Sequence, residues 1–156
     1  MSVLVGEKPA LAAMMRDYIA EMARIIEGVD PEAPYPHFDL YWTEPETRWP
    51  FWLRIDGDIN AGFALVRRDV SHDRTEMAEF FVTPSHRRID VGKSAARRLI
   101  ARFRGSWRIT ERESNAPAIA FWHQVLDGYV AYDETTSVTD AVRREQRFTS
   151  LGAGSP

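Results

Sequence analysis

The sequence predicts one α/β domain built on a mixed, mostly antiparallel sheet with flanking helices, and three observations support this. A length of 156 residues suits one domain with a single core. A hydrophobic content of 44% and an aromatic content of 12% are typical of a folded globular protein. From Met77 to Phe121 the apolar pattern reads strand–helix–strand–helix, which implies a crossover between parallel or near-parallel strands. We expect the domain to span residues 1–150, with a frayed tail at 151–156.

The amino-terminal third begins with "SVLVG" at residues 2–6, which predicts a short first strand. Apolar residues then recur at steps of three and four from Lys8 to Glu27, the spacing of an amphipathic helix, and Gly28 is expected to end it. Residues 30–50 are rich in both proline and aromatic residues. This combination predicts a packed loop with a short helical turn, which lines a pocket or covers the core.

The next segment predicts the first part of the sheet. Residues 51–68 have the pattern of a hairpin, because two apolar runs flank the turn sequence Asp56-Gly57-Asp58. The stretch "TEMAEFFVTP", residues 75–84, predicts a third strand that Pro84 ends.

The second half alternates helices and strands. Apolar residues at successive four-residue steps predict a helix from Val91 to Arg104. The stretch "SWRITER", residues 106–112, predicts a buried strand. Asn115 is expected to cap the following helix, which has Pro117 in its first turn. Residues 129–150 predict two more strands.

The composition excludes several kinds of chemistry. The chain has no cysteine, which excludes disulfides, thiolate metal sites and a cysteine nucleophile. Its four histidines show no metal-ligand spacing, so no metal is expected. The sequence has no run of about 18 apolar residues, and its first ten residues lack the basic and apolar regions of a secretory signal. We therefore expect a cytoplasmic protein that does not act at a membrane.

The charge is unevenly distributed along the chain. The net charge is −3, yet the segment from Arg87 to Arg108 holds eight basic residues and a single acid, Asp90. A basic segment in an acidic chain suggests a localised anionic ligand, although a solvated helix face also explains the outer arginines. Nucleic acid is not an expected partner, because the chain is acidic overall and these arginines alternate with apolar core positions.

The segment "HRRIDVGKSA", residues 86–95, joins the strand that ends at Val82 to the helix that begins near Val91. Free backbone N–H groups and the positive end of a helix dipole meet in such a turn and can bind phosphate. Asp90 supports two interpretations. Its carboxylate would repel a phosphate, but aspartate is also a favoured N-cap, and nearby cations could offset its charge. These cations are Arg87, Arg88 and Lys93.

This segment also carries a resemblance to a known family. The stretch "FFVTPSHRRIDVGKSAARRLI" is similar to the acyl-CoA-binding motif of the GNAT superfamily of N-acetyltransferases. The matching residues are Val82, Pro84, Arg87, Arg88 and Gly92. The stretch "NAPAIAFWHQVLDGY" resembles the second conserved block of that family. There the matches are Asn115, Ala118 and Phe121, followed by Gly128-Tyr129 after a longer spacer.

The resemblance implies an N-acetyltransferase that uses acetyl-CoA as the acyl donor and needs no metal. A primary amine would be the acceptor and would attack directly in a ternary complex. A central parallel strand pair would be splayed to admit the acyl-CoA. The backbone N–H near Val82 would polarise the thioester carbonyl, and Glu79 or Glu76 would act as general base. Homodimers are common in this fold.

The resemblance also implies a set of contacts to CoA. They come from Val82 and from the loop residues Arg87, Arg88, Asp90, Gly92 and Lys93. Asn115 would contact the pantetheine arm, or would act only as a helix cap, and Trp122 would form part of the pocket wall.

Two departures from the family pattern matter. Asp90 replaces the first glycine of the loop motif, and Trp122 stands where many relatives carry a tyrosine. They motivate one alternative, a degenerate, non-catalytic CoA-binding or protein-interaction module on the same fold.

Overall fold

The chain is arranged around a β-sheet. The computed structural model describes residues 1–55, 59–87 and 90–153 of the chain. Within these ranges six strands form one sheet in the order β1-β2-β3-β4-β6-β5. Only β3 and β4 are parallel neighbours, and the other pairs are antiparallel. The mixed, mostly antiparallel sheet is thus confirmed. The strands are β1 (Arg48–Ile55), β2 (Ile59–Asp69), β3 (Arg74–Val82), β4 (Gly105–Arg112), β5 (Val130–Val138) and β6 (Val142–Ser150).

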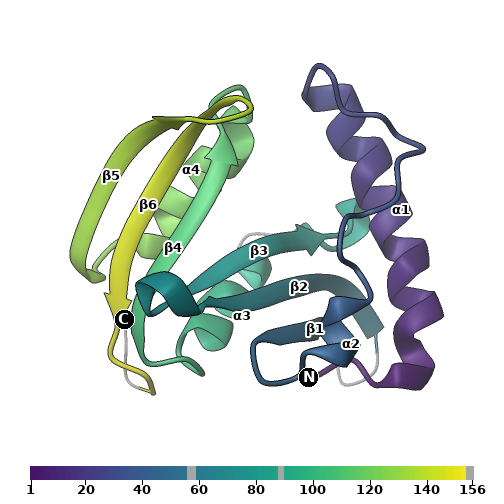
Figure 1. Cartoon of the computed structure of the whole chain (residues 1–156), viewed down its shortest axis with the longest axis horizontal. Coiled ribbons are helices and arrows are strands. Elements are labelled where there is room, and N and C mark those ends of the chain that lie inside the picture. The colour runs from purple at the N-terminus through teal and green to yellow at the C-terminus, as the bar shows by residue number, and fades with distance from the viewer. Residues whose placement is uncertain (56–58, 88–89, 154–156) are drawn as a thin grey trace.

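Helices cover both faces of this sheet (Figure 1). The helices α3 (Val91–Ile100) and α4 (Ala116–Leu126) pack on one face, in a core that includes Trp107. The helices α1 (Lys8–Ile25) and α2 (Leu40–Thr43) pack on the other face, around Phe63 and Phe81. The helical turn expected within residues 30–50 is α2, and the predicted helix at Lys8–Glu27 is α1.

Two sequence predictions need correction. Residues 2–6 do not form a strand: Ser2 makes one antiparallel bridge to Phe51, and Val5–Glu7 is a 3-10 turn. Leu4 and Val5 are largely exposed, so Val3 is the residue of this segment that contributes an apolar side chain to the core. The helix predicted to reach Arg104 ends at Ile100, because residues 101–103 tighten into three-residue turns before the left-handed Gly105.

The parallel pair is open over much of its length. Pairing between β3 and β4 is restricted to Thr75–Met77 against Trp107–Ile109. Immediately beyond, β3 carries a bulge, because Val66 pairs with Met77 and Leu65 with Glu79, which leaves Ala78 as the extra residue. Figure 1 shows β3 turning away from β4, which continues alongside β6. The splayed pair implied by the family resemblance is confirmed.

Gly62 lets β2 approach the end of β3 that borders this opening. A Cβ at this position would lie 1.9 Å from the Phe81 carbonyl oxygen. We predict that Gly62→Ala lowers the free energy of unfolding by at least about 2 kcal/mol, because the added methyl must push two backbones apart. Urea denaturation measures this. Gly6→Ala is the control, since a Cβ there meets no atom within 4 Å. Equal losses in the two variants would contradict the prediction.

Candidate active site

A cavity of about 910 Å³ occupies the opening between β3 and β4. Its walls are residues 77–82 of β3, residues 109–112 of β4, the first turns of α4, and α1 with the loop that follows it. The volume lies in the range of small-molecule sites in proteins. A cleft at this place can hold an elongated ligand between two strands whose facing edges do not pair.

The loop before α3 forms one end of this cavity. Asp90, Gly92 and Lys93 line it at the helix N-terminus, where free N–H groups and the helix dipole favour an anion. A Cβ on Gly92 would lie 3.2 Å from the Phe121 ring and 3.6 Å from the Val82 side chain. Glycine therefore lets the start of α3 pack closely against β3 and α4, and the predicted loop residues reach the cavity.

Asp90 does not cap α3 with its side chain, which removes the capping interpretation of this residue. Its backbone is left-handed, with φ of 75°, and its carboxylate accepts no bond from the first turn. A capping side chain needs the extended backbone of an ordinary N-cap to reach those N–H groups. A left-handed position favours glycine and tolerates aspartate, which explains how Asp90 can stand where the motif has a glycine.

The two loop arginines are placed differently. The Nε of Arg87 donates to the Val82 carbonyl oxygen at 2.8 Å, and its terminal nitrogens pair with Glu21 of α1 at 2.7 and 2.8 Å. Arg87 therefore fastens α1 to the end of β3, although it also lines the cavity. Arg88 lies outside the described residues. Among the loop cations that the structure describes, Lys93 has no competing carboxylate partner.

Asn115 and Trp122 both line the cavity from α4. The Oδ1 of Asn115 accepts from the Ala118 N–H at 3.3 Å, which confirms the predicted cap, and its Nδ2 donates to Met22 Sδ at 3.8 Å. Trp122 is buried and packs edge-on against the rings of Phe80 and Phe121. This position therefore offers an indole wall and no hydroxyl group.

Glu79 lies at the other end of the cavity, on β3 just past the bulge. Its carboxylate accepts hydrogen bonds from the Tyr35 hydroxyl, at 3.0 Å, and from the Tyr18 hydroxyl. Burial raises the pKa of Glu79, while both phenols and the charges of Arg143 and Arg67 oppose that shift. The result is a carboxylate with a raised pKa, held in position by two tyrosines.

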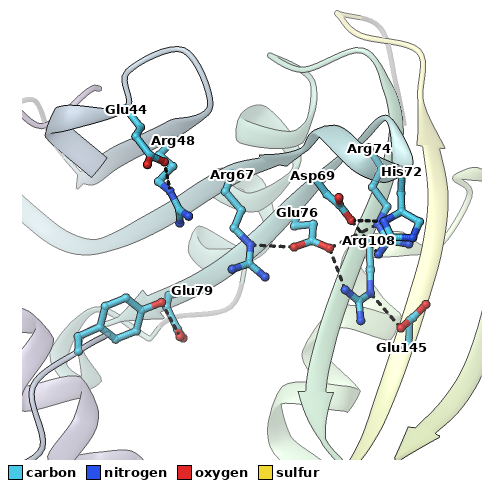
Figure 2. A network of polar contacts seen from close by, with 11 residues as sticks. Glu44, Arg48, Arg67, Asp69, His72, Arg74, Glu76, Glu79, Arg108 and Glu145 are labelled. Carbon is cyan, nitrogen blue, oxygen red and sulfur yellow. Dashed lines mark hydrogen bonds and ion pairs between the residues drawn. The ribbon is translucent and has the colours of Figure 1, made fainter. Parts of the chain in front are cut away.

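Glu76 belongs to a different environment. It does not line the cavity, and its oxygens accept from Arg67 Nε and Arg108 Nη1, each at 2.8 Å (Figure 2). Burial disfavours its charge, but hydrogen bonds from Arg108 and Arg67 outweigh that effect and lower its pKa. Of the two glutamates considered as general base, only Glu79 borders the cavity.

Three residues of the site were not anticipated. Tyr18 lies in the apolar stripe of α1, and Tyr35 lies in the proline-rich loop that follows. Neither sequence pattern indicates that the tyrosine has a carboxylate partner. Glu111 could have been found, because it continues the inward positions of Trp107 and Ile109 along β4.

Glu111 is a buried acid on the cavity wall. It is 6% exposed, and the Gln146 amide, oriented to donate, lies 2.8 and 3.1 Å from its oxygens. Burial raises the pKa of Glu111 to about 8, and the negative charge of Glu134 adds to that effect while Arg144 opposes it. Burial therefore favours the protonated form of this carboxyl group beside the cavity.

Two other kinds of feature are absent from the described ranges. No three or more His, Asp or Glu side chains there are arranged to hold a metal ion. No described helix has both the length and the apolar character needed to cross a membrane.

Fold and site together define a class: an α/β domain whose sheet opens between two parallel strands, with the N-terminus of α3 and the carboxylate of Glu79 both bordering the cavity. The sequence profile of the Acetyltransferase (GNAT) family matches residues 12–127. The chain therefore belongs to the GNAT acetyltransferase family. No curated protein sequence matches it.

Solved structures show the same fold at low sequence identity. The ribosomal-protein-S18-alanine N-acetyltransferase of Escherichia coli is 19% identical, with a TM-score of 0.62 over 99% of this chain and 94% of that one. The spermidine N-acetyltransferase of Vibrio cholerae, in complex with CoA and spermine, is 11% identical, with a TM-score of 0.68 over 96% and 94%. An acetyltransferase of Thermus thermophilus is 12% identical, with a TM-score of 0.69 over 95% and 94%.

The position of Asp90 predicts that its charge weakens anion binding at α3. We expect Asp90→Asn and Asp90→Gly each to lower the Kd for CoA about three- to tenfold, because both remove a negative charge and both tolerate a left-handed backbone. Isothermal titration calorimetry measures this. Asp73→Asn, at another left-handed aspartate that lies away from the cavity, should leave the Kd unchanged. An unchanged Kd in Asp90→Asn would show that the carboxylate does not oppose the ligand.

Glu111 predicts a pH-dependent stability. The pKa of Glu111 is higher in the folded protein than in the unfolded chain. The contribution of Glu111 to the free energy of unfolding is therefore fully present below about pH 4.5 and is lost as the pH rises through about 8. Glu111→Gln should therefore raise the free energy of unfolding at pH 8.5, by up to about 4 kcal/mol, and much less at pH 5. Urea denaturation at both pH values measures this, with Glu113→Gln as the control. The same change at both pH values would contradict the assignment.

Proposed function

We propose that this protein is an acetyl-CoA-dependent N-acetyltransferase that transfers the acetyl group to a primary amine by direct attack in a ternary complex. The observation that carries the proposal is the continuity of one cavity from the N-terminus of α3 to the carboxylate of Glu79. Membership of the GNAT acetyltransferase family supports the reaction class.

The cavity fits an acyl-CoA by its free backbone groups. The Thr83 N–H donates to the Ala61 carbonyl oxygen on the β2 side. Since N–H groups alternate in direction along a strand, those of Val82 and Phe80 point the other way, toward the splay. The pantetheine arm can bond to this unpaired edge, with Asn115 and Trp122 beside it. The diphosphate can lie at Gly92 and Lys93, where α3 begins.

Acetyl-CoA, when bound, supplies a thioester carbonyl, and the protein supplies donors for it. The backbone N–H of Val82, or of Phe80 one pleat earlier, can stabilise the negative charge that develops on the carbonyl oxygen. Both groups belong to a strand fixed by the β2 ladder and by Arg87 on the Val82 carbonyl. These donors therefore need no rearrangement to act.

Glu79 is the proposed general base. An alkylammonium acceptor has a pKa of about 10.4 and must lose a proton before its nitrogen can attack. The raised pKa of Glu79 improves the match between the two groups, and its tyrosine partners hold both oxygens at the cavity. Trp122 cannot protonate the departing sulfur, because an indole N–H does not release its proton near neutral pH. The thiolate, whose thiol has a pKa of about 8.5 in the cysteine analogue, can leave and take its proton from water.

The proposal predicts a specific loss of turnover in Glu79→Gln. We expect kcat/KM to fall at least about 100-fold while the Kd for CoA stays within about twofold, because only proton removal is impaired. Thiol release with acetyl-CoA and a panel of primary amines measures turnover, and calorimetry measures binding. Glu76→Gln is the control, and its loss should appear mainly in stability. If millimolar acetyl-CoA gives neither a calorimetric signal nor a thermal shift, the proposed function is wrong.

The tyrosine bonds predict a change in the pH profile. The Tyr35 hydroxyl stabilises the charged form of Glu79, so Tyr35→Phe should raise the pKa of Glu79 further. The acidic limb of kcat/KM should then move to higher pH than in the parent enzyme. Tyr132→Phe, whose hydroxyl bonds Glu134 away from this carboxylate, should leave that limb in place. An unmoved limb in Tyr35→Phe would remove Glu79 as the titrating base.

A further inference from the structure

A row of charged residues crosses the sheet beside Glu79. Strand register places Arg48 of β1 opposite Arg67 of β2, Arg67 opposite Glu76 of β3, Glu76 opposite Arg108 of β4, and Arg108 opposite Arg147 of β6. Residues that are paired across strands project from the same face. The row therefore forms one band of side chains with four cations and one anion in register.

Two of the four arginines of the band are exposed, whereas the acids that pair with the band are buried. The side chains of Glu76 and of Glu145, which pairs with Arg108 and Arg147, are only 7% and 5% exposed. Those of Arg67 and Arg147 are 45% and 54% exposed. The acids hold the inner nitrogens of the arginines, and the outer guanidinium faces remain accessible. A ligand that reaches this band meets positive charge.

Arg67 does not line the cavity itself, but it is the member of the band whose charge acts on the proposed base Glu79. Its Nε donates to Glu76, and within the described part of the chain no bond engages its two terminal nitrogens. Its charge lowers the pKa of Glu79 and that of Tyr41, so it lies within electrostatic reach of both. Figure 2 shows its guanidinium on the same side of β3 as the Glu79 carboxylate.

Arg48 adds a second positive charge at this place. It lies directly opposite Arg67, its Nε donates to Glu44 at 2.8 Å, and its guanidinium lies 5.7 Å from the centre of the Tyr41 ring. Like charges that are directly opposite destabilise a strand pair. An anion between or beside the two guanidinium groups would offset that repulsion.

We propose that the acceptor is an amine that also carries a carboxylate, with the amine at Glu79 and the carboxylate at Arg67. This inference rests on the proposed function, because it assigns the substrate class of the same site. A guanidinium with two free terminal nitrogens binds a carboxylate through two parallel hydrogen bonds. The same positive band repels an acceptor that carries additional ammonium groups. The acceptor class is therefore an acidic amino compound, such as an acidic amino acid or a peptide with an acidic residue near its amino terminus.

The test uses three dipeptide amides that differ in one side chain: Ala-Glu-NH2, Ala-Gln-NH2 and Ala-Lys-NH2. Thiol release from acetyl-CoA gives kcat/KM for each, and calorimetry gives the Kd of each for the protein–CoA complex. We expect Ala-Glu-NH2 to exceed Ala-Lys-NH2 by at least about tenfold in both measurements, with Ala-Gln-NH2 between them.

Variants separate recognition from structure. Arg67→Gln should remove most of the preference for Ala-Glu-NH2 over Ala-Gln-NH2, whereas Arg67→Lys, which keeps the charge, should retain much of that preference. Arg104→Gln makes the same charge change on the exposed turn before β4 and should alter none of the three. A purely structural ion pair at Arg67 would instead affect all three peptides equally, and that result would overturn the proposal.

The two proposals fail in different ways. If Ala-Lys-NH2 binds and reacts as well as Ala-Glu-NH2, the acceptor class is wrong while the acetyltransferase activity stands. If the three peptides bind in the expected order and no thiol is released, the acetyltransferase function is wrong while the recognition of an anionic amine stands.

Discussion

The loss of pairing between β3 and β4 after Met77 is the constraint on which the rest of the site depends. A parallel pair inside a sheet normally continues to the strand ends, because unpaired backbone groups are costly when buried. Here the bulge at Ala78 bends β3 away from β4, and the exposed edges become the walls of the cavity. The same extra residue places Glu79 on the face of α1, within reach of Tyr18 and Tyr35.

Side-chain contacts around the opening between β3 and β4 keep its two sides in place. Arg87 ties the end of β3 to Glu21 of α1, and Asn115 links the start of α4 to Met22 of the same helix. Trp122 fills the base of the opening against Phe80. Glu111 shows the energetic cost of this arrangement, because its carboxyl group is buried in the cavity wall with the Gln146 amide as its hydrogen-bond partner. The cavity is thus held by side chains from both helical layers, not by the sheet alone.

The sequence predicted the sheet and helices well, because apolar periodicity and turn residues act locally. It placed both ends of α1 within two residues and the start of α4 at its Asn115 cap, and it placed the loop before α3 through its match to a motif. It could not separate Glu76 from Glu79, since their environments depend on a bulge and on arginines from β2 and β4. It left open whether the Asp90 side chain caps α3, because a left-handed backbone cannot be read from residue identity. The partners of Glu79 come from segments 44 and 61 residues away, and no local pattern brings them together.

In the proposed site, Arg67 would link acceptor binding to the strength of the base. In the free protein the positive charge of Arg67 lowers the pKa of Glu79 and partly cancels the effect of burial. A carboxylate bound to Arg67 would neutralise that charge, and Glu79 would then hold a proton more strongly. The acceptor's own ammonium brings the proton that Glu79 must take. An amine that also carries a carboxylate would thus make Glu79 a stronger base when it binds. An amine without an anionic group would leave the charge of Arg67 unneutralised, and Glu79 would remain a weaker base. In this arrangement, recognition of the acceptor and activation of its nitrogen are two effects of the same ion pair.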